Sequence, residues 1–289
     1  MGIKKSIRNK TITISDKEKP TLLRQLCFNG DIKRNGVILD TIISAHADEV
    51  LNGIDDDSIS LVFIDPPYLS KSNHSAPEYR RWLEELLFMT YDKMKNNASI
   101  YICQDWYGSS IVEEAILNAD FTIQNRITWV RNKGRGALRN WKSMHEDIWF
   151  ATKTDDYKFN LSSVLVKKDV KAPYRDRGVP KDWGIIDGKP FRLTMPSNMW
   201  TDMCVPFWSM PENTEHPHQK PEKLLERIIK ASSDKGDTVL DFFAGSGTTG
   251  VVAKRLGRHF ILIEKDTSWC CIAQKRINEE NSVESKSID

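Results

Sequence analysis

The stretch that decides the fold is residues 238–266, TVLDFFAGSGTTGVVAKRLGRHFILIEKD. One apolar run ends at Asp241, glycines follow at positions 245, 247 and 250, and a second apolar run ends at Glu264. A strand, a glycine-rich turn, a helix and a strand ending in an acidic residue are typical of nucleotide-binding α/β folds. Glycine lets the backbone approach a ligand closely, and a carboxylate can accept hydrogen bonds from both ribose hydroxyls. The stretch therefore predicts a turn that binds an adenosine-containing ligand.

The type of that ligand stays open at this point. Gly245-x-Gly247-x-x-Gly250 satisfies the dinucleotide fingerprint, so an NAD-dependent oxidoreductase is one interpretation. Two threonines, Thr248 and Thr249, follow the first two glycines, and Asp241-Phe242-Phe243 precedes them; both features are less typical of a pyrophosphate site. They favour a nucleoside ligand without phosphates.

Short apolar runs rich in Val, Ile, Phe and Trp continue outward from this stretch, as expected for strands buried on both faces. Helical patterns lie between them, and strands that alternate with helices indicate a doubly wound, mostly parallel α/β sheet. The predicted strands are residues 60–64, 99–103, 123–129, 147–151, 238–242 and 260–264. The predicted helices are residues 78–95, 109–118, 222–233 and 248–256.

Two parts of the chain do not follow the alternation. Residues 1–35 are predicted as an N-terminal arm, and its polar start, residues 1–20, is interpreted as frayed. Residues 154–215 are rich in Lys, Asp, Pro and Trp, and they predict an irregular insertion packed by Trp183, Trp200 and Trp208. The remaining segments, residues 36–153 and 216–289, form the two halves of one domain.

Composition excludes several classes of protein. The net charge is +2, and no segment approaches the roughly 20 apolar residues of a membrane helix. The N-terminus has no apolar core and is not a secretory signal. The five cysteines have no C-x-x-C spacing, so we expect reduced thiols, no metal site and a cytoplasmic protein.

The motif FIDPPYLS, residues 63–70, ends a predicted strand with two consecutive prolines. Proline removes a backbone N–H and restricts the residue before it, so the strand must stop there and the turn is stiff. A carboxylate, Asp65, stands just before the prolines and an aromatic ring, Tyr68, just after them. The alternative is that Asp65 only shapes a turn and Tyr68 only packs.

A basic stretch lies between positions 121 and 144, where six basic residues and no acidic residue occur. Trp129 and Trp141 are interleaved among them, and glycines stand at positions 134 and 136. This mixture suits a phosphate backbone, although a solvated loop is an equally good interpretation of this stretch alone.

Three motifs together resemble one family. DPPY at residues 65–68, HPHQKP at residues 216–221 and DFFAGSGTT at residues 241–249 are similar to those of exocyclic-amino DNA methyltransferases. The order resembles the permuted beta group, in which the catalytic motif precedes the cofactor motif. The linking pieces RITWVRNKG, HEDIWFATK and SNMW are similar to restriction–modification adenine methyltransferases. One departure is His218, where the family has threonine.

The resemblance implies a methyltransferase fold with circularly permuted motifs and a direct transfer of methyl from S-adenosyl-L-methionine to the N6 amine of a flipped-out adenine. S-adenosyl-L-homocysteine is the implied product. The exocyclic lone pair is delocalised into the ring, so two acceptors on its N–H groups would localise it. The carboxylate of Asp65 and the carbonyl of Pro66 would be these two acceptors, and Pro67 would make the turn rigid. The ring of Tyr68 would stack on the flipped base.

The same resemblance assigns the cofactor site. It implies that Lys220 pairs with the methionine carboxylate, that Glu264 binds the ribose, that Asp48 contacts the adenine end and that His216 orders its loop. The full set of implied cofactor-binding residues is Asp48, Asp65, Lys220, Asp241, Phe242, Phe243, Ala244, Gly245, Ser246, Gly247, Thr248 and Glu264.

Double-stranded DNA is the implied partner, and residues 154–215 correspond to the target-recognition region of the family. Basic residues would hold phosphates, and Arg or Asn would read base edges. The candidates are Arg131, Lys133, Arg135, Arg139, Lys142, Arg175, Arg177, Arg192 and Asn198. The resemblance also makes a homodimer possible, and a cognate restriction endonuclease that acts on the same site. It implies that the protein is encoded by a bacterium, an archaeon or a phage and is associated with the nucleoid.

Alternatives to adenine-N6 methylation remain at this stage. A cytosine-N4 methyltransferase needs the same geometry, but the family tendency is Ser before the prolines for cytosine, and this chain has Asp65. An NAD-dependent oxidoreductase gives DPPY and HPHQKP no role. An inactive DNA-binding subunit would not need the intact motif. The sequence does not give the recognition site.

Overall fold

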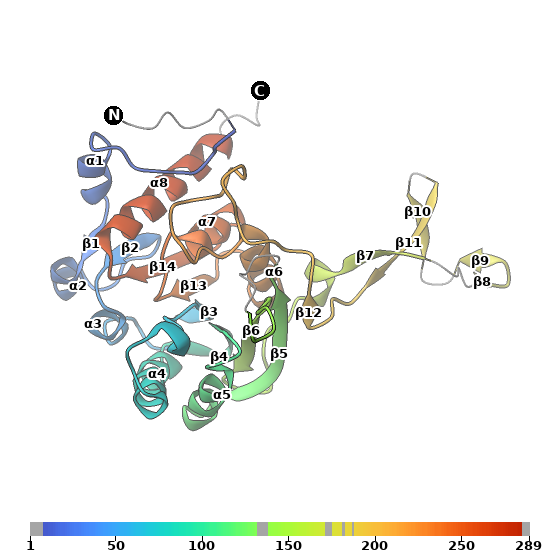
Figure 1. Cartoon of the computed structure of the whole chain (residues 1–289), viewed down its shortest axis with the longest axis horizontal. Coiled ribbons are helices and arrows are strands. Elements are labelled where there is room, and N and C mark those ends of the chain that lie inside the picture. Colours follow the sequence, from blue (N-terminus) through green and yellow to red (C-terminus); the bar gives the residue numbers. More distant parts are fainter. Residues whose placement is uncertain (1–7, 132–137, 171–174, 181–182, 187, 285–289) are drawn as a thin grey trace.

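A nine-stranded sheet forms the centre of the protein (Figure 1). The computed structural model describes residues 8–131, 138–170, 175–180, 183–186 and 188–284. Along the sheet the strands are β1 (Cys27–Phe28), β2 (Thr41–Ser44), β14 (His259–Glu264), β13 (Thr238–Asp241), β3 (Ile59–Ile64), β4 (Met94–Gln104), β6 (His145–Thr152), β5 (Thr122–Val130) and β12 (Met199–Trp200). Strands from the end of the chain thus lie between β2 and β3, which joins the two halves into one sheet.

Most strand pairs in this sheet are parallel. The exceptions are the two pairs made by β6, which runs antiparallel to both β4 and β5. Every residue of β3 is buried, as expected for a strand covered on both faces, and five of the six residues of its sequence ISLVFI are apolar. The predicted mostly parallel α/β sheet is confirmed, and each of the six predicted strands is found within a few residues of its expected bounds.

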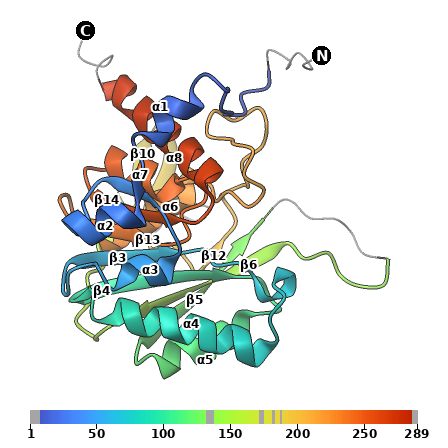
Figure 2. The ribbon, with the colours of Figure 1, turned by 90° about the vertical axis from the view of Figure 1, so that its left-hand side faces the viewer.

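Helices cover both faces of the sheet (Figure 2). One buried cluster joins the sheet to α1 (Lys19–Leu23), α6 (Glu222–Ser232), α7 (Thr248–Arg255) and α8 (Thr267–Glu284). A second cluster joins the opposite face to α2 (Asn29–Asn35), α3 (Ala47–Leu51), α4 (Ala76–Tyr91) and α5 (Ser109–Asn118). Two separate apolar clusters, one on each face, are what a doubly wound sheet requires.

The four predicted helices are present, and one differs in its bounds. We expected a helix over residues 78–95, whereas α4 begins at Ala76 because Ser75 forms a capping box with Glu78. It ends at Tyr91 because Met94 and Lys95 belong to β4. None of the helices in the described ranges combines the length and apolar character that a membrane crossing requires.

The second half of the predicted N-terminal arm, residues 19–35, has regular structure. Helix α1, strand β1 and helix α2 occupy this part, and β1 pairs in parallel with β2. Leu22 and Leu26 are buried in the core, so a few apolar side chains anchor a segment that is polar on average. Further upstream, the N–H of Ile12 donates to the carbonyl of Asn213 at 2.7 Å.

The insertion at residues 154–215 is also more regular than expected. After a 3-10 turn, η2 (Leu161–Val164), it forms an antiparallel sheet of β7 (Val166–Asp169), β11 (Lys189–Thr194) and β10 (Gly184–Ile186), and a pair of β8 (Arg175–Asp176) and β9 (Val179–Pro180). These strands project from the body of the protein (Figure 1). Of the three tryptophans expected to pack the insertion, only Trp200 is buried. Trp208 is 52% exposed, and Trp183 is partly buried with the guanidinium of Arg175 over its ring.

Candidate active site

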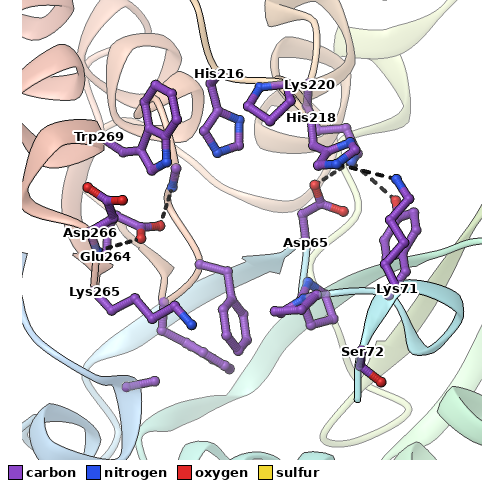
Figure 3. Close-up of a pocket in the computed structure, with 18 of the residues that line it drawn as sticks. Asp65, Lys71, Ser72, His216, His218, Lys220, Glu264, Lys265, Asp266 and Trp269 are labelled. Carbon is purple, nitrogen blue, oxygen red and sulfur yellow. Dashed lines mark hydrogen bonds and ion pairs between the residues drawn. The ribbon is translucent and has the colours of Figure 1, made fainter. Parts of the chain in front are cut away.

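A cavity of about 740 Å³ lies at the carboxyl ends of the central parallel strands. Asp65 follows β3, Phe242 and Phe243 follow β13, and Glu264 ends β14, so three neighbouring strands deliver their motifs to one place. Ligands of open α/β sheets bind at this edge, where the strand order reverses. Figure 3 shows Asp65 and Lys220 on one side of the cavity and Glu264 and Trp269 on the other.

The DPPY turn forms one wall of the cavity. Lys220 donates from Nζ to Oδ2 of Asp65 and, at 3.2 Å, to the hydroxyl of Tyr68. The other carboxylate oxygen of Asp65, Oδ1, is buried and has no hydrogen-bond partner among the described residues. A buried carboxylate oxygen without a donor is costly, so a ligand that brings an N–H or O–H to Oδ1 would be held there.

Charges around Asp65 are strongly coupled. Burial raises the pKa of Asp65, and the adjacent ammonium of Lys220 opposes that rise. Burial alone would lower the pKa of Lys220, but the carboxylates of Asp65 and Glu146 raise it above its ordinary value. Lys220 is therefore a permanent cation at the catalytic motif.

We expected Lys220 to pair with the methionine carboxylate of the cofactor, but in the structure its ammonium contacts side chains of the protein. Asp65, Tyr68 and Glu146 already surround its ammonium, with Glu146 Oε2 at 3.4 Å. An ammonium has three N–H donors, and these three neighbours can accept all of them.

The glycine-rich turn forms the opposite wall. Gly245 has φ +49° and lies so close to His216 that a Cβ atom would be 3.0 Å from the imidazole Nε2. The N–H of Gly245 donates to Oε2 of Glu264, and the N–H of Asp266 donates to Oε1, each at 2.9 Å. A carboxylate has about four acceptor sites, so Glu264 can still accept hydrogen bonds from a ligand.

His216 packs between this turn and α8. Its ring meets the ring of Trp269 edge-on at 4.8 Å, and its Nδ1 is buried without a partner among the described residues. Burial lowers the pKa of His216 to about 4, so the imidazole is neutral at physiological pH.

Not every residue of the predicted cofactor set faces the large cavity. Those that line it are Asp48, Asp65, Lys220, Phe242, Phe243, Gly245 and Glu264. Asp241, Ala244, Ser246 and Thr248 line a smaller space of about 30 Å³ that shares Asp65 and Lys220 with the large cavity.

Asp241 and Gly247 hold the shape of the turn. The carboxylate of Asp241 accepts from the N–H of Phe243 at 3.0 Å and from the hydroxyl of Thr249 at 2.5 Å. Gly247, with φ +74°, lines neither space, and a Cβ there would come within 2.5 Å of the Cβ of Ala273 in α8. Both positions therefore fix the backbone of the turn that forms this wall of the cavity.

The structure adds lining residues that the sequence did not indicate. Glu146, at the start of β6, is 4% exposed and faces Lys220, and Trp129, Trp269 and His46 also line the cavity. A buried acid at the head of an apolar strand is a weak signal in a sequence, because the same pattern describes an exposed strand end.

The predicted DNA-binding residues are dispersed. Arg131 lines the cavity and pairs with Glu146 at 2.7 Å, while Arg139 and Lys142 are exposed. Lys133 and Arg135 lie outside the described residues. The remaining four lie in the insertion and do not line the cavity: Arg175, Arg177, Arg192 and Asn198.

Asn198 has a role within the protein. Its Nδ2 donates to the Asn125 side chain and to the carbonyl of Arg126, both at 3.1 Å, and its carbonyl accepts from the N–H of Thr128 at 2.7 Å. These contacts fix the β12 segment to β5.

Comparison with known proteins connects this site to a family. A family model described as DNA methylase matches residues 59–275. The chain is 34% identical to DNA adenine methyltransferase YhdJ of Escherichia coli (strain K12) over 248 residues, which cover 82% of each protein. It is 30% identical to type II methyltransferase M2.DpnII of Streptococcus pneumoniae, covering 88% of this chain and 98% of that protein.

Solved structures share the fold. PvuII DNA methyltransferase, which is named as cytosine-N4-specific, superimposes with a TM-score of 0.63 at 18% identity over 86% of this chain and 93% of that one. The M1.HpyAVI–SAM complex superimposes with a TM-score of 0.57 at 24% identity over 82% and 98%. The matched region contains the DPPY turn, the HPHQKP loop and the glycine-rich turn, so the chain belongs to the DNA methylase family.

Proposed function

We propose that this protein transfers the methyl group of S-adenosyl-L-methionine to the N6 amine of an adenine in duplex DNA, as the modification enzyme of a restriction–modification system. Membership of the DNA methylase family supports methyl transfer to DNA. The adenine-specific name of YhdJ and the type II name of M2.DpnII support the base and the biological setting.

The observation that carries the proposal is the unpartnered oxygen of Asp65. Oδ1 is a buried acceptor at the cavity wall, and the carbonyl of Pro66 follows it in the same rigid turn. Two acceptors at fixed positions can bind both N–H groups of an exocyclic amine and draw its lone pair out of the ring. Fixed acceptors of this kind stabilise the charge that develops on the nitrogen as the methyl group arrives.

The opposite wall has groups that fit the nucleoside part of S-adenosylmethionine. Glu264 can accept from ribose hydroxyls, Gly245 lets the backbone come close, and the exposed Asp48 lies at the start of α3 on the cavity rim. When bound there, the cofactor supplies an electrophilic methyl group. Phe243 and Trp82, whose ring centroids are 5.7 Å apart, give the cavity an apolar side between the two walls.

Adenine is favoured over cytosine. The geometry of Asp65 serves either exocyclic amine, so the cavity alone does not separate the two bases. PvuII methyltransferase, which is named as cytosine-N4-specific, is only 18% identical to this chain, so its similarity supports the fold but not the choice of base. YhdJ, which is 34% identical, is named as an adenine methyltransferase. A flipped adenine would stack on Tyr68, which lines the cavity and is 8% exposed.

Residues 154–215 are proposed as the target-recognition region, with residues 36–153 and 216–289 as the catalytic and cofactor halves of one domain. The projecting strands carry exposed Lys167, Lys168, Arg175 and Arg177, a charge pattern that suits DNA phosphates. A homodimer and a cognate endonuclease remain proposals from the family resemblance.

The test is base identification after methyl transfer. The protein is incubated with duplex DNA and S-adenosylmethionine carrying a heavy-isotope methyl group, and the digested nucleosides are separated by mass spectrometry. The proposal expects labelled N6-methyldeoxyadenosine. Labelled N4-methyldeoxycytidine would move the function to cytosine, and DNA binding without any label would indicate an inactive subunit.

A further inference from the structure

Glu146 is a buried acid at the cavity for which the proposed mechanism has no role. Its Oε1 pairs with Nη1 of Arg131 at 2.7 Å, and its Oε2 lies 3.4 Å from Nζ of Lys220. Oε2 is buried and has no hydrogen-bond partner among the described residues. Glu146 thus faces two cations, and one of them also holds the catalytic Asp65.

These four side chains form what we call the ion cluster: Asp65, Glu146, Lys220 and Arg131. It has two carboxylates and two cations; Glu146 and Lys220 are almost completely buried, and Asp65 is largely buried. Buried charges are tolerated only when they are paired, because removing one partner leaves an uncompensated charge. Burial alone would raise the pKa of Glu146, but Lys220 and Arg131 lower it below its ordinary value, so Glu146 is ionised. The cluster is balanced only while Glu146 is negative.

The cluster is held from separate strands. Asp65 follows β3 and Glu146 belongs to β6, with β4 between them in the sheet, while Lys220 precedes α6. The ammonium of Lys220 therefore has an anion on either side, and the hydroxyl of Tyr68 is its third neighbour, at 3.2 Å. In this position it binds Oδ2 of Asp65 and leaves Oδ1 unoccupied.

We propose that Glu146 is a positioning residue for methyl transfer: it holds Lys220 on one oxygen of Asp65 and so keeps the other oxygen open for the amine of the target base. The inference rests on the proposed function. Without the charge of Glu146, Asp65 is the only anion of the cluster next to Lys220. The ammonium then moves toward Asp65 and competes with the amine for Oδ1.

The first test is Glu146→Gln, which keeps the size of the side chain and removes its charge. The rate of methyl transfer in a single turnover is measured with saturating DNA and S-adenosylmethionine. We expect a loss of roughly 10- to 100-fold, the scale of a small misplacement of reacting groups, with little change in the dissociation constant of either ligand.

The matched control is Asp147→Asn. Asp147 is the next residue of β6 and is equally buried, but it accepts from the Ser109 hydroxyl at 2.6 Å and does not line the cavity. This control should keep a rate close to that of the wild-type protein. A merely structural role of Glu146 would lower the thermal stability of Glu146→Gln and leave the titration of Asp65 unchanged.

A second readout does not require activity. The titration of Asp65 is followed by carboxyl 13C NMR on aspartate-labelled protein, with Asp65→Asn to assign the signal. Charged and titratable groups face Asp65 from several elements: Lys220, Glu146, Tyr68, Tyr79, Cys103, Asp241 and His218. Loss of a nearby negative charge favours ionisation, so Glu146→Gln should shift the midpoint of Asp65 to lower pH.

Two results would contradict the inference. One is an unchanged Asp65 midpoint in Glu146→Gln, and the other is a wild-type rate of transfer in that variant. Failure of the proposed function would be seen separately, as an absence of methyl transfer by the wild-type protein. The titration would then still show whether Glu146 controls the charge at Asp65.

Discussion

Replacing Asp65 with asparagine is the sharpest perturbation of the proposed mechanism. The side chain keeps its size, but its charge is lost and one carboxylate oxygen becomes an NH₂ donor. Because Lys220 is a donor, the amide oxygen of the new side chain would turn toward it, and the NH₂ group would then occupy the position of Oδ1. The target amine would meet a donor where it needs an acceptor.

The expected loss can be estimated from the hydrogen bond at stake. Removing one preorganised group that stabilises a developing charge costs about 10²–10³ in rate, or roughly 3–4 kcal/mol. We expect at least that loss for Asp65→Asn, because a repulsive contact replaces an attractive one. Glu264 lies on the opposite wall together with Gly245, whose N–H donates to it, so the dissociation constant for S-adenosylmethionine should change little.

The assay combines single-turnover methyl transfer with calorimetric titration of S-adenosylmethionine. Lys220 keeps Glu146 as a counter-ion in the variant, so the protein should remain folded. Asp147→Asn controls for the loss of a buried carboxylate from another strand of the same sheet. If Asp65→Asn transferred methyl groups within tenfold of the wild-type rate, the role of Oδ1 as the acceptor would be wrong.

Three further predictions concern the turn and the basic stretch. Gly247→Ala should lower the free energy of unfolding, measured by urea denaturation, by roughly 2–4 kcal/mol, because the new Cβ clashes with α8 and the position has a positive φ. Gly257→Ala is the control: it has a positive φ but no clash, so the free energy of unfolding should fall by only about 1–2 kcal/mol. Burial raises the pKa of Asp241 from 3.8 to about 7, so the native state binds the extra proton and its stability should fall as pH rises from about 4 to 7. Asp241→Asn should remove this part of the pH dependence of unfolding. Replacing the exposed Arg139 and Lys142 with alanine should weaken DNA binding in filter or anisotropy assays, and the difference from wild type should shrink as salt increases.

Strong local patterns explain what the sequence predicted correctly. The strands β3, β13 and β14 are rich in buried Val, Ile, Leu and Phe, and an acidic residue ends or directly follows each of them. Parallel strands bring their carboxyl ends to one edge, so Asp65, Asp241 and Glu264 could be placed together from the sequence. The side chains that line the cavity were less predictable, because Asp241 turns into its own loop rather than toward the ligand.

Long-range contacts explain what the sequence missed. Strand β1 has two residues and depends on pairing with β2, and the N-terminal segment near Ile12 depends on residues more than 200 positions away. The insertion forms antiparallel pairs of only two to four residues each, in which polar and apolar residues are mixed, so there is little apolar periodicity to detect. The contact of Glu146 with Lys220 joins two segments whose local sequences do not indicate it.

The most direct test of the central claim is to map modified bases in the DNA of a methylation-deficient host that expresses this protein. Single-molecule sequencing of that DNA, with Asp65→Asn as the paired control, reads the base and its sequence context together. The account predicts N6-methyladenine at one recurring sequence with the wild-type protein and its loss with the variant. Unmodified adenine with the wild-type protein, or equal modification with both proteins, would contradict it.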